Sequence, residues 1–214
     1  MNFNKHLNLE GQHALLGASK FYWIDDDEDA FLKRMRSSYA TTIGTLLHDI
    51  ARKHIKHSFK LAKGDKRSVL LELIDKGIPA RIIDEMDFDA LYSNLSTYVN
   101  DAIGYKMQPE VVLRYSDYCF GTTDAINFNE SKKFLRIHDY KSGSTPAHIE
   151  QLMIYEALFC LEYKYKPGDI ESELRIYQSN DVLIHNPTPD EILPIIEKMI
   201  QFDKFIREIT GWED

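Results

Sequence analysis

The amino-acid sequence predicts an α/β fold in which helices flank a mixed central sheet. Two observations predict this class. Apolar residues follow helical spacing through much of the first 104 residues, and three consecutive segments rich in β-branched and aromatic residues then follow between residues 110 and 141. A helical segment, one more strand and a closing helix complete the order. Hairpin-connected strands followed by a helical crossover to a further strand imply a mixed sheet.

The first half of the chain is predicted to be helical. Ser19 can cap a short helix through Trp23, and the acidic run Asp25–Asp29 is typical of a solvated turn or a helix start. Apolar stripes at helical spacing, with glycines as stop signals, predict longer helices over residues 41–63, 66–76 and 88–103.

The second half is predicted to carry the sheet. Strands are expected over residues 110–116, 119–128, 134–141 and 173–178, and helices over residues 147–163 and about 188–209. Because no repeat, low-complexity stretch or Gly/Ser linker divides the chain, we expect a single domain over 1–214. Its parts are a helical region over about 1–104, a sheet-bearing core over about 105–180 and a C-terminal helix over about 188–210.

The composition is that of a globular protein, with 43% hydrophobic and 28% charged residues. This excludes a disordered or fibrous chain, and no apolar run approaches the roughly 18 residues that a membrane span requires. The polar start predicts no signal peptide. Cys119 and Cys160 cannot supply a four-thiolate metal site and do not suggest a disulfide framework. We therefore expect a soluble cytoplasmic protein, in the host cytoplasm if a phage encodes it.

Charge is distributed unevenly along the chain. The net charge of −8 argues against a generic nucleic-acid coat protein. Residues 41–67, however, hold seven bases and two acids, whereas residues 1–30 hold six acids and two bases. A polyanion could bind the basic segment, with ordinary solvated helix charges as the alternative.

Three side chains of the predicted sheet point to metal chemistry. Asp139 and Lys141 alternate along one strand and so share a face of the sheet. Asp124 lies within an otherwise apolar stretch of the preceding strand, where hairpin pairing could bring it close to Asp139. Two such carboxylates repel each other, and a divalent cation such as Mg²⁺ resolves the repulsion. A purely structural role for Asp124 is the alternative.

Two helices contribute further candidates. Gln151 and Tyr155 lie four residues apart, hence on one face of the helix that follows the Asp139 strand. His48 follows Gly44 by one turn on the basic helix. Surface roles are the alternative for each of these side chains. The candidates for contacts with a phosphate backbone are Arg52, Lys53, Lys56, Lys60 and the loop residue Ser142.

In this order, the motifs resemble the PD-(D/E)xK nuclease superfamily, specifically its RecB-like branch, which includes phage exonucleases. The motifs are Gly44-x-x-x-His48, Gly121-x-x-Asp124, Asp139-x-Lys141 and Gln151-x-x-x-Tyr155. The resemblance covers about residues 41–63 and 105–180. It implies a restriction-endonuclease-like core of αβββαβ order and a stand-alone, metal-dependent deoxyribonuclease that takes Mg²⁺ or Mn²⁺. A catalytically silent nucleic-acid-binding or assembly protein is the alternative.

The resemblance also implies roles for single residues. His48, Asp124, Asp139 and the backbone carbonyl of Tyr140 would bind the metal ion. Lys141 would position or help deprotonate the attacking water, and the remaining candidates would orient these groups, namely Gln151, Tyr155 and, in a supporting role, Glu110. No iron–sulfur cluster is expected from two cysteines. The resemblance leaves open DNA against RNA, exonuclease against endonuclease, a homo-oligomer and a recombination or single-strand-annealing partner.

Overall fold

The computed structural model describes residues 4–11, 14–143 and 145–211. The chain divides into two compact units, Met1–Thr42 and Ile43–Asp214. No helix within the described ranges combines the length and the apolar character that a membrane crossing requires.

Over residues 4–11 and 14–42, the first unit holds two 3-10 segments, Leu7–Leu9 and Ala18–Asp25, and the beginning of helix α1 (Glu28–His57). Neither 3-10 segment contains a buried residue. The acidic run does start a helix, since Asp27 accepts a hydrogen bond from the Ala30 N–H at 2.8 Å. Helix α1 therefore begins well before residue 41, where the apolar stripe predicted its start.

The second unit continues with α2 (Lys66–Asp75), α3 (Ala80–Asp84) and α4 (Phe88–Gly104). The predicted helices over 66–76 and 88–103 are confirmed to within a residue at each end. Helix α1 ends at His57 rather than at the predicted residue 63, because Ser58 adopts a left-handed backbone with φ of 56°. Helix α4 begins after Asp87, whose side chain accepts a hydrogen bond from the Ala90 N–H at 2.9 Å.

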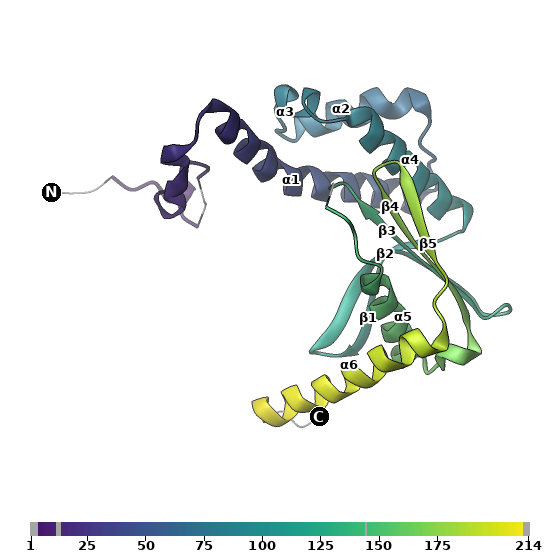
Figure 1. The fold of residues 1–214 in the computed structure, drawn as a ribbon. Coiled ribbons are helices and arrows are strands. Elements are labelled where there is room, and N and C mark those ends of the chain that lie inside the picture. Colours follow the sequence, from purple (N-terminus) through teal and green to yellow (C-terminus); the bar gives the residue numbers. More distant parts are fainter. Residues whose placement is uncertain (1–3, 12–13, 144, 212–214) are drawn as a thin grey trace. The chain divides into compact units, whose positions relative to one another are not determined.

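The sheet is mixed and has five strands in the order β1-β2-β3-β4-β5 (Figure 1). The first three strands pair antiparallel, β4 runs parallel to β3, and β5 returns antiparallel to β4. The predicted α/β class with a mixed sheet is therefore confirmed. The strands are β1 (Gln108–Ser116), β2 (Cys119–Asn129), β3 (Phe134–Lys141), β4 (Glu171–Gln178) and β5 (Asp181–His185).

Strand β5 extends the sheet beyond residue 180, where the sequence predicted its end. Ser179 and Asn180 have φ of 52° and 60°, so they form a two-residue turn that returns the chain directly along β4. Neither residue is glycine, and the Asn-Gly or Asp-Gly signal of such turns is missing. The closing helix α6 (Pro189–Thr210) follows, close to its predicted bounds.

Helices cover the sheet on both faces. Helix α5 (Glu150–Tyr163) packs on one face over a core that includes Leu135 and Ile137, and α6 packs against α5. Helix α4 covers the other face, where the Tyr98 ring stacks on the Tyr140 ring at 5.6 Å. Alternation along β3 therefore directs Asp139, like Ile137, to the α5 face.

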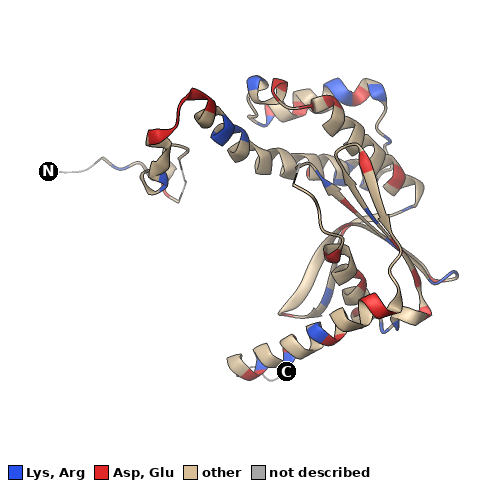
Figure 2. Cartoon of the chain, viewed as in Figure 1, with Lys and Arg blue, Asp and Glu red and all other residues tan. Residues whose placement is uncertain are grey.

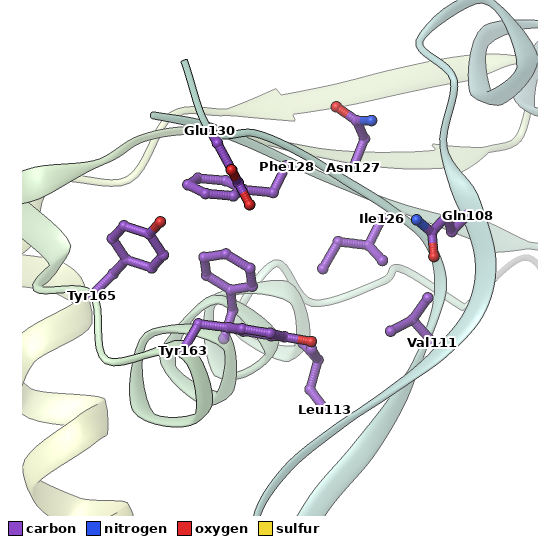
Figure 3. Close-up of a pocket in the computed structure, with 10 residues that line it drawn as sticks. Gln108, Val111, Leu113, Ile126, Asn127, Phe128, Glu130, Tyr163 and Tyr165 are labelled. Atoms are coloured by element: carbon purple, nitrogen blue, oxygen red, sulfur yellow. The ribbon is translucent and has the colours of Figure 1, made fainter. Parts of the chain in front are cut away.

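A cavity of about 320 Å³ opens beside the core between β2 and the end of α5 (Figure 3). Aromatic side chains wall it, and Glu130 points its carboxylate toward them. The lining rings are those of Phe128, Phe159, Tyr163 and Tyr165. None of the predicted site residues lines this cavity, so it is separate from the candidate site.

Candidate active site

The β2–β3 pairing brings the two predicted aspartates together. Ala125 pairs with His138, so one further step of the same register places Asp124 beside Asp139. The Tyr140 N–H donates to Asp124 Oδ2 at 2.9 Å. Burial raises the pKa of both carboxyls, and the charge of Asp124 raises the pKa of Asp139 further. Without a metal ion, this end of strands β2 and β3 therefore disfavours the ionisation of both carboxyls.

Lys141 links Asp139 to helix α5. Its Nζ donates to Asp139 Oδ1 at 3.1 Å and lies 2.9 Å from Oδ2. The same ammonium donates to Gln151 Oε1 at 3.1 Å, and Gln151 Nε2 donates to the Tyr155 hydroxyl at 3.3 Å. A continuous line of contacts therefore runs from Asp139 through Lys141 and Gln151 to Tyr155.

Helix α1 places His48 at the same end of β2 and β3. His48 Nδ1 lies 3.5 Å from Asp124 Oδ2, and its ring packs edge-on against Tyr140 at 5.4 Å between centroids. Burial, the main cause, lowers the pKa of His48. The neutral imidazole that this favours is the form that binds metal ions.

The two motif glycines make room for side chains of the site. A Cβ on Gly121 would lie 2.8 Å from Cε1 of Tyr155, well inside contact distance. A Cβ on Gly44 would lie 3.0 Å from the Ser142 Oγ. Gly121 therefore lets the Tyr155 ring lie against β2, and Gly44 lets the loop after Lys141 approach α1.

The basic segment of α1 is largely engaged in ion pairs. Arg52 contacts Glu110 and Asp49, each at 3.1 Å, and Lys53 contacts Glu72 at 3.1 Å. Lys56 is exposed on the same helix. The structure thus brings Glu110 to Arg52, and the charge of Glu110 is one of the causes that raise the pKa of Asp124.

Two amide side chains that the sequence did not single out hold the backbone around Lys141. Gln178, in register with Lys141 on β4, donates to the carbonyls of Gly143 and Thr145 at 2.6 and 2.7 Å. Its Oε1 accepts from the Ala147 N–H at 3.0 Å. Asn94 of α4 donates to the Tyr177 carbonyl at 2.9 Å and to that of Lys141 at 3.4 Å.

The donor set fits a divalent cation that draws part of its coordination from outside the side chains. Asp139 Oδ2 is buried and, among the described residues, accepts no well-directed hydrogen bond, although the Lys141 ammonium touches it. As the side chains stand in the described ranges, no three His, Cys, Asp or Glu residues are arranged as a metal site, and this includes His48, Asp124 and Asp139. Mg²⁺ does not need such a cage, because one or two carboxylates, waters and substrate phosphate oxygens suffice.

No protein-family model matches the chain, and no curated protein matches it. The evidence for function is therefore the site itself. The site consists of two neighbouring carboxylates, a lysine that contacts one of them and an imidazole close to the other, and these side chains come from β2, β3 and α1.

Proposed function

We propose that the protein is a metal-dependent nuclease of the PD-(D/E)xK superfamily that hydrolyses phosphodiester bonds in DNA. Within that superfamily, we place it among the stand-alone, phage-type RecB-like exonucleases of DNA recombination or processing. One observation carries the proposal: Asp139 and Lys141 contact each other on the same sheet face as Asp124, and the contacts continue to Gln151 and Tyr155. Three antiparallel strands, a helix and a parallel strand support a restriction-endonuclease-like core.

The metal ion would be Mg²⁺ or Mn²⁺, held by His48, Asp124, Asp139 and the Tyr140 carbonyl. When bound, such an ion supplies Lewis acidity and lowers the pKa of coordinated water. The Tyr140 N–H fixes one oxygen of Asp124, so the other oxygen remains for the ion. The imidazole of His48 suits Mn²⁺ better than Mg²⁺.

Lys141 would act on the phosphate and on the attacking water. Its ammonium, about one third exposed beside the buried Asp139 carboxylate, can donate to a water or a phosphate oxygen from outside the sheet. Gln151 accepts from the same ammonium and is itself bonded to the Tyr155 hydroxyl. These two side chains would therefore orient Lys141 rather than take part in bond cleavage.

Digestion of end-labelled single- and double-stranded DNA tests the proposal. The protein would be supplied with Mg²⁺, Mn²⁺ or EDTA, and closed circular DNA would report endonuclease activity. Lys141→Met retains the length of the side chain without its charge, and Lys166→Met, at an exposed position, is the matched control. We expect cleavage of linear DNA that requires both the metal ion and Lys141, and we expect the Lys166→Met variant to retain it. Binding of DNA without cleavage under any condition would favour the silent binding or assembly protein instead.

A further inference from the structure

A second polar cavity, of about 460 Å³, lies between the end of α4 and the turn that joins β2 to β3. Cationic side chains line it, whereas no acidic side chain does among the described lining residues. These cations are Lys106, Lys132 and Arg136. The β2–β3 turn also stands out as basic in Figure 2. The sign of this lining is opposite to that of the whole chain, whose net charge is −8.

Two of these three cations, Lys106 and Lys132, give the cavity positive charge that no carboxylate partner in the described part of the chain balances. Arg136 donates through Nε to Glu173 at 2.9 Å, and Glu173 also accepts from Arg175, whose second partner is Asp101. These two arginines are thus balanced by two carboxylates. Lys106 and Lys132, in contrast, form no ion pair with a carboxylate among the described residues.

A side-chain hydrogen bond holds the backbone at each lysine. Lys106 adopts φ of 56° two residues after the end of α4, and its carbonyl accepts from Asn127 Nδ2 at 3.1 Å. The Lys132 N–H donates to Asn129 Oδ1 at 3.0 Å within the β2–β3 turn. Arg136 is fixed as well, because its guanidinium lies over the rings of Tyr105 and Phe134 at 4.3 and 4.5 Å. A ligand would therefore meet fixed backbone anchors and one fixed guanidinium.

The neighbouring residue Glu130 is not part of the lining of this cavity. Glu130 lines the aromatic cavity of Figure 3 instead, and Asn127 and Phe128 of β2 line both cavities. The basic cavity is also separate from the candidate active site. Arg136 and Asp139 lie three residues apart on β3, so their side chains face opposite sides of the sheet, and that of Arg136 faces α4. Phe134, which also lines the cavity, lies roughly 16 Å from Asp139 along the strand.

We propose that this cavity binds a phosphate-bearing anion of nucleotide size. Its volume lies within the range of roughly 300–1,000 Å³ that small-molecule sites occupy. Two lysine ammonium groups and a fixed arginine are donors that suit phosphate oxygens. The phosphate could belong to a free nucleotide or to the end of a nucleic-acid strand. The proposal does not depend on nuclease activity.

Calorimetric titration in EDTA tests the proposal, because no metal is then available for cleavage. The probes are deoxyadenosine, dAMP, and one short oligonucleotide prepared with and without a 5′-phosphate. The test variant combines Lys106→Asn with Lys132→Gln, asparagine being suited to the left-handed backbone at 106. The control combines Lys133→Asn with Lys164→Asn, which removes two charges at left-handed positions (φ of 48° and 60°) outside the cavity lining.

We expect dAMP to bind and deoxyadenosine not to bind, with the dAMP affinity about tenfold lower in the test variant and nearly unchanged in the control. Binding of only the 5′-phosphorylated oligonucleotide, lost in the test variant, would support the site and assign it to strand ends. Equal weakening in both double variants would overturn the proposal, as would failure of every phosphate probe to bind at about 10 mM. This assay measures binding at the basic cavity without metal, so it does not test Asp124 and Asp139. A negative result would therefore not count against the proposed nuclease activity.

Discussion

Glu156 of α5 offers a quantitative test of the buried electrostatics. The side chain is 2% exposed and accepts a hydrogen bond from the Ser172 Oγ at 2.8 Å. Burial raises its pKa from an ordinary 4.5 to about 7. The folded protein thus holds this proton more tightly than the unfolded chain does, so stability falls as the pH rises from about 4.5 to about 7. At about 1.4 kcal/mol per pKa unit, the loss is about 3 kcal/mol.

The variant Glu156→Gln removes the buried charge and retains an oxygen that can accept from Ser172. We expect the free energy of unfolding of the variant, minus that of the parent protein, to be about 2–3 kcal/mol larger at pH 8 than at pH 5. Urea unfolding in EDTA at both pH values measures this difference, and the exposed Glu197→Gln is the control. Other titrating groups cancel in the comparison. A stability difference that stays constant between the two pH values would refute the reasoning.

Three further predictions concern the candidate site. Gly121→Ala places a Cβ 2.8 Å from Tyr155 Cε1, so we expect the free energy of unfolding measured with urea to fall by about 1–3 kcal/mol. If the same substitution costs as much in a Tyr155→Ala protein, the contact with Tyr155 is not the cause. Gln178→Leu removes three hydrogen bonds to the loop after Lys141, so we expect the free energy of unfolding to fall by about 2–4 kcal/mol and the kcat for DNA cleavage to fall as well. An unchanged kcat would show that the loop does not position Lys141. Asp124→Asn should stabilise the metal-free protein at pH 8 and abolish the rise in Tm on adding Mn²⁺; a variant that still responds to Mn²⁺ would place the ion elsewhere.

The sheet core was predictable because its strands alternate and its turns are polar. β3 was predicted with its observed bounds, Phe134–Lys141, and α4 to within one residue. The misses share a cause, namely the lack of an apolar stripe. The buried residues of α1 all lie between Ile43 and Ile55, so its first turns gave no signal. β5 is short and only partly buried, and α3 spans five residues.

The candidate site was predictable only in part. The spacing of Asp139 and Lys141 along one strand fixes their common face, and hairpin pairing follows from the short β2–β3 turn. Asn94 and Gln178 gave no such signal, because their hydrogen-bond partners lie 31 to 83 residues away in the chain. The ion pairs of Arg52 with Glu110 and of Lys53 with Glu72 could not be predicted from the sequence either, because only the tertiary fold brings these glutamates to α1.

The pKa values of carboxyl groups on the two faces of the sheet are shifted in opposite directions. On the α4 face, burial opposes ionisation of Glu173, but hydrogen bonds from Arg175 and Arg136 prevail and lower its pKa. On the α5 face, the pKa of Asp124 and that of Asp139 are both raised although Lys141 is in contact with Asp139. The first arrangement stabilises the fold by itself. The second opposes the ionisation of its own carboxyls, and this observation supports the proposed metal site.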